Sequence, residues 1–428
     1  MKKLAWKIYK NATLIKTGVL EIGDGYRAKN SEFSLTGLPF ARAGNIKNGF
    51  QFELADLLSE KNVHKAKNKL ANIGDCVITT KGTFGRVAFV DKKTGMFVYS
   101  PQLCYWRVKN NKVINPRYLY YWLQGPEFLN QAYQIKSSTD MADYANLSDQ
   151  RNMHISLPDI QVQKKIAAIL SAYDDLIENN KRRIALLENM AEEIYREWFV
   201  RFRFPGYQTA EFEKGIPKGW ALGRIDSLGK VVTGKTPSTA NIKYYGGDIP
   251  FIKTPDMHGN MFLYETDEKL TEEGLMSQLS QIIMQNSICV SCIGTGGVVS
   301  ITTRKCSTNQ QINSVSLKRE ADLEWAFFTL KMLKSTILAF GATGATMTNL
   351  SKGKFAAIKA IVPPKDLRIE FNNVVKPLFN QIQLLAQANM NLINTRDNLL
   401  PRLISGKLSV ENLNIQFPPS MQTTAEAE

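Results

Sequence analysis

The chain of 428 residues repeats its own layout, and this repeat constrains its fold more than any other feature. Segments of the first half return in the second half in the same order. The pairs are "LPFARAGNI" from Leu38 and "IPFIKTPDM" from Ile249, "CVITTKGTFGRVAFV" from Cys76 and "CVSCIGTGGVVSITT" from Cys289, "MADYANLS" ending at Ser148 and "TGATMTNLS" ending at Ser351, and "ISLPDIQVQKKI" from Ile155 and "AIVPPKDLRIEF" from Ala360. The offsets of 211, 213, 203 and 205 residues keep one register, so we predict two copies of one structural unit.

Each copy ends in a long amphipathic helix. Apolar residues follow a 4-3 spacing from Ile166 to Trp198 and again from Phe371 to Leu403. Each seam is interrupted by an asparagine, Asn180 in the first and Asn389 in the second, which can fix the register of a helix pair. At 1.5 Å per residue such a helix spans roughly 60 Å. We predict that the two helices pack antiparallel as rigid spacers.

The helices follow two globular blocks that carry the positive charge. Short β-rich runs at residues 76–90 and 288–302, each followed by a helix, predict mixed α/β blocks and an α+β fold overall. The net charge is +11 for residues 1–155 and +4 for residues 208–361, whereas residues 156–207 and 362–428 are neutral. This segregation favours a polyanionic partner for the globular blocks.

Other features exclude several protein classes. No stretch approaches the ~20 apolar residues of a membrane span, and the N-terminus lacks the apolar core of a signal peptide, so we expect a cytoplasmic protein without membrane contact. Cys289 and Cys292 have CxxC spacing inside a strand-like run. Residues three apart on a strand point to opposite faces, so structural thiols are favoured over a zinc site.

Letters of catalytic motifs occur without their structural context. Gly229–Thr236 matches a phosphate-binding loop, but no buried strand precedes it and Pro237 follows at once. "IGTGG" from Ile293 only superficially resembles an S-adenosylmethionine loop, and the chain lacks the (N/D)PP(Y/F) motif of adenine methyltransferases. Asp256, Asp267 and Lys269 give a loose nuclease-like lettering in a loop-like acidic stretch. We predict a non-catalytic chain with no catalytic and no metal-binding residues.

Four segments carry a specific resemblance. "ALLENMAEEIYREWFVRFRFPG", "IPKGW", "TGKTPSTANIKYYGGDIPFIK" and "RDNLLPRLISGKL" strongly resemble the specificity subunit of Type I restriction-modification systems, and the match covers nearly the full chain. The resemblance implies two target-recognition domains in pseudo-twofold repeat, separated by two long antiparallel coiled-coil helices. The implied ranges are target-recognition domain 1 at 1–158, the first spacer helix at 159–207, domain 2 at 208–362, the second spacer helix at 363–408, and a C-terminal tail at 409–428.

The resemblance also implies a function and partners. Each domain would read one half of a split site in double-stranded DNA, and the helices would set the gap and dock two methyltransferase subunits. S-adenosylmethionine would be bound by those subunits, with no cofactor on this chain, and motor/nuclease restriction subunits would join for cleavage.

Three loop-like segments recur in both halves and supply the candidate DNA contacts. Basic side chains give affinity through phosphates, whereas side chains at base edges give specificity. The candidates are Tyr26, Arg27, Lys29, Arg42, Lys81, Thr83, Arg86, Tyr144, Arg151, Lys235, Thr236, Lys253, Thr295, Thr346 and Lys352. Two alternatives stay open: a self-sufficient nuclease using Asp256, Asp267 and Lys269, and a scaffold whose basic blocks bind RNA or an acidic protein.

Overall fold

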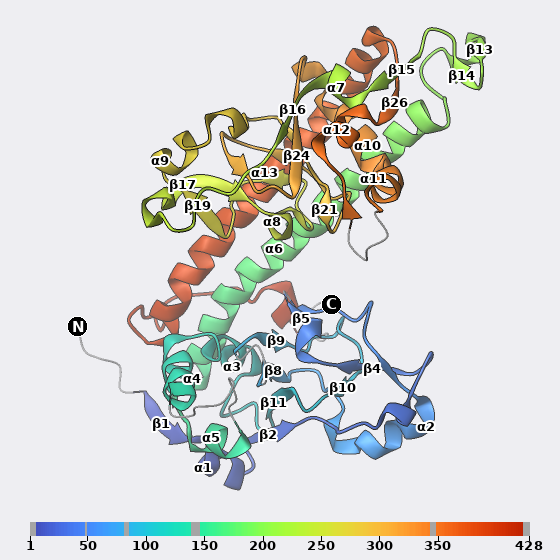
Figure 1. The fold of residues 1–428 in the computed structure, drawn as a ribbon. Helices are drawn as coiled ribbons and strands as arrows, with labels where there is room; N and C mark the ends of the chain where they lie inside the picture. The colour runs from blue at the N-terminus through green and yellow to red at the C-terminus, as the bar shows by residue number, and fades with distance from the viewer. Residues whose placement is uncertain (1–5, 48, 81–84, 138–145, 343–347, 423–428) are drawn as a thin grey trace. The chain divides into compact units, whose positions relative to one another are not determined.

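The computed structural model describes residues 6–47, 49–80, 85–137, 146–342 and 348–422 (Figure 1). The chain divides into two compact units. Unit 1 comprises Met1–Glu178 and Asn391–Glu428, and unit 2 comprises Asn179–Met390. Each unit contains one globular block and a part of both long helices, so the repeat seen in the sequence corresponds to two separate cores.

Unit 1 is built on two four-stranded sheets, ordered β2-β11-β8-β9 and β10-β4-β7-β3, with β1 paired antiparallel to β12. Its strands are β1 (Lys7–Lys10), β2 (Leu20–Asp24), β3 (Phe33–Ser34), β4 (Leu38–Ala41), β5 (Ile46–Lys47), β6 (Gly49–Phe50), β7 (Leu57–Leu58), β8 (Cys76–Thr79), β9 (Val87–Phe89), β10 (Val98–Tyr99), β11 (Leu103–Val108) and β12 (His154–Leu157). Its shorter helices are α1 (Asn11–Lys16), α2 (Glu60–Val63), α3 (Pro116–Trp122), α4 (Pro126–Ser137) and α5 (Leu147–Asn152).

Unit 2 repeats this plan with a five-stranded sheet, β16-β24-β20-β22-β18, a three-stranded sheet, β19-β17-β23, and the pairs β15–β26, β13–β14 and β21–β25. Its strands are β13 (Phe212–Glu213), β14 (Ile216–Pro217), β15 (Ala221–Arg224), β16 (Gly229–Thr233), β17 (Tyr245–Ile252), β18 (Phe262–Leu263), β19 (Glu268–Leu270), β20 (Ile288–Ser291), β21 (Ile293–Gly294), β22 (Val299–Thr302), β23 (Ser307–Thr308), β24 (Ile312–Leu317), β25 (Thr348–Asn349) and β26 (Lys359–Val362). Its shorter helices are α7 (Ile225–Leu228), α8 (Thr254–Met257), α9 (Glu272–Met276), α10 (Leu323–Met332), α11 (Lys334–Gly341) and α12 (Lys352–Ala357).

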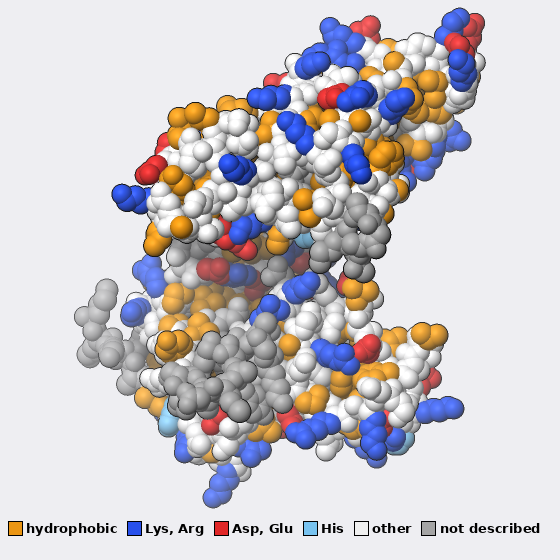
Figure 2. All heavy atoms as spheres, in the orientation of Figure 1, with side chains coloured by type: hydrophobic (Ala, Val, Ile, Leu, Met, Phe, Trp, Pro, Cys, Tyr) orange, Lys and Arg blue, Asp and Glu red, His pale blue; other side chains and the backbone are white. Residues whose placement is uncertain are grey.

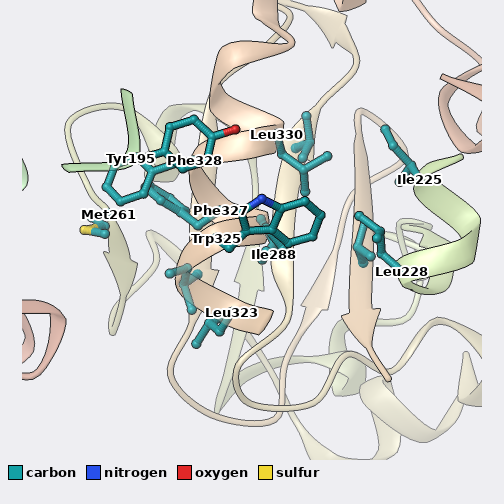
Figure 3. Close-up of a cluster of buried hydrophobic side chains, with 14 of the residues drawn as sticks. Tyr195, Ile225, Leu228, Met261, Ile288, Leu323, Trp325, Phe327, Phe328 and Leu330 are labelled. Carbon is teal, nitrogen blue, oxygen red and sulfur yellow. The ribbon is translucent and has the colours of Figure 1, made fainter. Parts of the chain in front are cut away.

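The helix expected over residues 115–124 of unit 1 is α3, and a second helix, α4, begins at Pro126. The helix expected over residues 322–338 of unit 2 is instead broken into α10 and α11. In unit 2, Leu333 leaves helical geometry between α10 and α11. Helix α10 carries the centre of the larger core. Figure 3 shows its side chains Trp325, Phe327 and Phe328 among residues of the neighbouring strands and helices.

The two long helices α6 (Ile160–Tyr195) and α13 (Lys365–Ile404) pack together through the predicted seams (Figure 1). In unit 2, Asn180 Nδ2 donates to Asn389 Oδ1 at 2.9 Å, and the two residues are only 9% and 8% exposed. In unit 1, Arg396 forms an ion pair with Asp174 at 2.6 Å. The polar residues that interrupt the seams, Asn180, Asn389 and Arg396, each have a partner on the other helix.

Local structure accounts for the CxxC spacing and for the phosphate-loop lettering. Cys289 packs in one hydrophobic cluster of unit 2 and Cys292 in another. Burial raises the pKa of Cys289 to about 12 and that of Cys292 to about 11, so both remain neutral thiols. Gly229–Thr233 forms strand β16, and the next helical turn begins only at Ile242. The phosphate-loop lettering therefore has no helix N-terminus beside it.

Candidate nucleic-acid interface

In unit 2, several loops meet around the turn that leads into β24. Gly234 follows β16 and lies so close to this turn that an added Cβ would come within 2.1 Å of Thr308 Oγ1 and 2.2 Å of the Asn309 carbonyl. The next backbone N–H, that of Lys235, donates to the Thr308 carbonyl at 2.9 Å. The Thr236 hydroxyl donates to the Gln310 amide oxygen at 2.8 Å. The end of β16 is thereby fixed against residues 308–310.

Gln311 joins two further loops to this turn. Its carbonyl accepts the Cys292 N–H at 2.7 Å, and its side-chain oxygen accepts the Thr254 hydroxyl at 3.3 Å. Cys292 leads into β21, whose pairing with β25 brings the loop that contains Thr295 next to the segment that precedes Lys352. Lys253 precedes Thr254. The segments that carry Lys235, Thr236, Lys253 and Thr295 therefore converge on residues 308–311, whereas Lys352 is the first residue of helix α12 and lies outside this cluster.

Unit 1 builds the same cluster from its own residues. An added Cβ on Gly25 would come within 2.1 Å of the Ser100 carbonyl, and the Tyr26 N–H donates to the Tyr99 carbonyl at 2.7 Å. The Gln102 carbonyl accepts the Thr80 N–H at 2.8 Å, and its side-chain oxygen accepts the Ala43 N–H at 3.0 Å. These bonds correspond one by one to those of Gly234, Lys235 and Gln311. We name the two assemblies the loop clusters: residues 25–29, 42–45, 79–80, 85–86 and 99–102 in unit 1, and residues 234–236, 253–256, 291–298 and 308–311 in unit 2.

The candidate side chains differ in whether they already bond to other groups of the protein. Arg42 pairs with Asp56 at 2.7 Å, Lys253 pairs with Glu268, and the Arg86 guanidinium donates to the Ile46 carbonyl at 3.1 Å. By contrast, the exposed side chains of Arg27, Arg151, Lys235 and Lys352 have no hydrogen-bond or ion-pair partner among the described residues.

Tyr26 sits in a small polar network of unit 1. Its hydroxyl donates to the Glu32 carboxylate at 3.1 Å, and Lys65 pairs with the same carboxylate at 2.9 Å. Burial and the bond to Glu32 raise the pKa of Tyr26. The bond from Lys65 and that from the Lys29 N–H lower the pKa of Glu32 to about 2. This network holds the chain that follows Gly25 in place.

Not every candidate joins a cluster. Arg151 lies in the last turn of α5, which packs against α1 and β2, and no described contact links it to residues 99–102. Lys81, Thr83, Tyr144 and Thr346 lie outside the described residues. Gln102, Gln310 and Gln311 were missed by reasoning from sequence, because that reasoning weighted basic and hydroxyl residues. The repeat itself holds the signal, since Gln102 and Gln311 each stand directly before the first residue of a core strand, β11 or β24.

The nuclease-like lettering has a structural explanation. Asp256 accepts the backbone N–H groups of Lys253 and Asp267, at 2.7 and 3.1 Å, so its carboxylate closes a turn. Lys269 lies on β19, not in a loop as the sequence suggested, and pairs with Glu265 at 2.5 Å. These residues stabilise the border of the three-stranded sheet.

Comparison with known proteins identifies the family. The family model "Type I restriction modification DNA specificity domain" matches residues 15–189 and again residues 217–392. The chain belongs to this family. Each of the two matched segments spans one globular block and most of the long helix that follows it, as the internal repeat predicts.

Relatives match most of the length of the chain. The HindI specificity subunit of Haemophilus influenzae is 28% identical, with 90% of this chain and 98% of that protein covered. The MjaIX specificity subunit of Methanocaldococcus jannaschii is 24% identical, with coverages of 83% and 82%. A crystal structure of a Type I S subunit from M. genitalium shares the fold, with a TM-score of 0.55 at 14% identity over 94% of this chain and 97% of that one.

Membership in the family gives the chain its role. It is the DNA specificity subunit of a Type I restriction-modification system, with two target-recognition domains, and it is the non-catalytic component of the enzyme. S-adenosylmethionine is bound by the methyltransferase subunits of such enzymes and not by the specificity subunit. Among the described residues, no helix combines the length and apolar character needed to cross a membrane.

Proposed function

We propose that each loop cluster contacts one half of a bipartite site in double-stranded DNA. The observation that carries this proposal is that both units build the cluster with corresponding hydrogen bonds but present different exposed side chains, such as Arg27 in unit 1 and Lys235 in unit 2. Positive charge alone does not mark the surface, because lysine and arginine side chains are spread over the visible face of unit 2 (Figure 2). The clusters instead combine basic, amide and hydroxyl groups on loops held by a rigid scaffold.

The two long helices are proposed to set the gap between the half-sites and to dock two methyltransferase subunits. Support comes from large apolar side chains that the helices expose: Leu186 and Met190 on α6 are 63% and 54% exposed, and Leu384 on α13 is 67% exposed. Solvent-facing apolar residues on a structured helix favour a protein partner. Motor/nuclease restriction subunits would complete the assembly, which would act in the cytoplasm.

The proposed domain limits follow from this assignment. Residues 1–158 and 208–362 form the target-recognition domains, residues 159–207 and 363–408 include the spacer helices, and residues 409–428 form a tail. The candidate contacts are the fifteen residues named from the sequence, and the described structure supports most strongly those that belong to the loop clusters.

The test is to express the chain with its methyltransferase and to sequence the methylated bases of the host DNA. We expect one bipartite motif with a fixed gap, and the purified complex should bind a duplex that carries it more tightly than duplexes with either half scrambled. Cleavage of plasmid by the purified chain with Mg²⁺ would instead establish the nuclease alternative. Absence of duplex binding, even with the methyltransferase present, would favour the scaffold alternative.

A further inference from the structure

Gln102 and Gln311 occupy the same place in the two loop clusters. Each residue stands directly before a central strand, and each carbonyl accepts the N–H of the residue that follows a central strand, Thr80 after β8 and Cys292 after β20. The side chain of each then turns toward the corresponding loop, which contains Ala43 in unit 1 and Thr254 in unit 2. The two glutamines are thus equivalent in position and in conformation.

The hydrogen bonds fix which end of each amide faces the protein. In unit 1 the partner of Gln102 Oε1 is a backbone N–H, which can only donate. In unit 2 Gln311 Oε1 accepts from the Thr254 hydroxyl and, at 3.1 Å, from Asn309 Nδ2. The Asn309 amide is itself oriented, because its Oδ1 accepts the Gln311 N–H at 3.1 Å. Both side-chain oxygens are therefore engaged by the loop that contains Ala43 or Thr254, and neither NH₂ group takes part in these bonds.

Among the described residues, the two side-chain NH₂ groups are donors that remain unused. Neither Gln102 Nε2 nor Gln311 Nε2 has a hydrogen-bond partner within the described part of the chain. Gln102 is exposed, and Gln311 Nε2 faces the Gly294 turn, where an added Cβ would lie 3.9 Å away. The basic residues Arg42 and Lys253 immediately precede the two loops that hold the amide oxygens. A fixed donor beside basic side chains is suited to an acceptor on an anionic ligand.

We propose that Gln102 and Gln311 are DNA-contacting residues that donate from Nε2 to an acceptor at corresponding positions of the two half-sites. This inference rests on the proposed function and adds two residues outside the basic and hydroxyl set. The bidentate contact of a glutamine with adenine needs both a free oxygen and a free NH₂ group. Gln311 lacks the free oxygen, so its contact is a single donated bond, to a purine N7 or O6, a thymine O4 or a phosphate oxygen.

The decisive substitution is Gln311→Glu, because a carboxylate keeps the acceptor for Thr254 and Asn309 and replaces the donor with a second, negatively charged oxygen. We expect the melting temperature to stay within error of the wild type, while the complex with methyltransferase binds its cognate duplex roughly tenfold more weakly. Gln311→Met is the matched control, since it removes donor and acceptor together and should lower both the melting temperature and the affinity. Gln102→Glu should give the same pattern for the other half-site.

Charge repulsion and a lost hydrogen bond are separated by salt. The repulsion between an added carboxylate and DNA is screened as ionic strength rises, whereas the loss of a donor is not, so the weaker binding should persist across the salt series. Duplexes that carry 7-deazapurines or single methylphosphonates in one half-site then locate the acceptor. On the duplex that lacks the acceptor, the wild type should lose its advantage in affinity over the variant. The inference is overturned if wild-type complex binds the bipartite site and both glutamate variants bind it equally well. Failure of the wild type to bind any duplex would overturn the proposed function instead.

Discussion

The two target-recognition domains differ in their outward side chains far more than in the backbone that carries them. Gly25 and Gly234 make the same close approach, Gln102 and Gln311 tie the same loops, and the Thr79 and Ser291 hydroxyls each accept the N–H seven residues later. At the tips, by contrast, Tyr26 stands where unit 2 has Lys235, and Arg86 stands where it has Val298. A shared backbone that carries different side chains on its loops is the arrangement expected of two domains that read two different sequences.

The closely packed backbone of the loop clusters should tolerate substitution least, so a change there should have the largest effect on stability and binding. Gly234→Val would place side-chain carbons against the Thr308 and Asn309 oxygens, at distances near 2.1 Å, and should destabilise unit 2 by about 3 kcal/mol or more. Denaturant unfolding should show a weaker transition, and binding should lose the second half-site while the first is still recognised. Gly353→Ala is the control, since an added Cβ there meets nothing within 4 Å. Equal loss of both half-sites would show that the two target-recognition domains are not independent.

Lengthening the two spacer helices should change the gap between the half-sites and leave both target-recognition domains intact. Because both long helices run through both units, the insertion has to be matched: four residues after Glu178 in α6 and four after Met390 in α13. Four residues add roughly 6 Å and nearly one turn, so the apolar seams keep facing each other. Methylome sequencing should report the original half-sites with a gap longer by about two base pairs. Methylation at only the original spacing and at full efficiency would show that the helices do not measure the DNA.

Breaking the Asn180–Asn389 pair between the two long helices should have a smaller effect. Asn180→Leu alone leaves the Asn389 amide buried without its partner and should cost about 1–3 kcal/mol in the free energy of unfolding. The double change of Asn180 and Asn389 to leucine should restore most of this loss, because two apolar residues satisfy each other. A double-mutant cycle on the four proteins measures the coupling. Additive losses in the cycle would show that the amide–amide bond does not act as a unit.

These seams, the repeat and the charge segregation were all readable from the sequence, because periodicity of 3.5 residues and repetition are properties of the order of residues. The polar interruptions at Asn180 and Asn389 were also visible, but their pairing with each other was seen only in the structure. The site was less predictable, because Gln102 and Gln311 owe their orientation to hydrogen bonds with loops far away in the sequence. The break between α10 and α11 and the place of Lys269 on a strand were likewise not visible in the sequence.

A pH effect should separate the two domains, since only unit 1 holds the Glu32 network. The pKa of Glu32 is lowered to about 2, so its contribution to stability is fully present above its ordinary pKa near 4.5 and is lost as the pH falls toward 2. Glu32→Gln should therefore lower the melting temperature of unit 1 at pH 7, and this effect should shrink as the pH falls below 4.5 and vanish toward pH 2. The substitution should leave unit 2 unchanged at every pH. A mutational effect that stays constant from pH 7 to pH 3 would contradict the role of the Glu32 charge.

The smallest effect concerns one exposed side chain in each cluster. Lys235 and Arg27 have no described partner within the protein, so removing either should leave the melting temperature unchanged. If Lys235 contacts a phosphate, Lys235→Ala should weaken binding to cognate and scrambled duplexes by the same factor and reduce the salt dependence of log K by about one. If Arg27 reads a base edge, Arg27→Ala should instead relax one position of the first half-site, by about 1–3 kcal/mol, and leave the second unchanged. Competition binding over a salt series separates the two behaviours. An Arg27→Ala effect shared equally by both half-sites would show that the residue at this tip does not belong to one module alone.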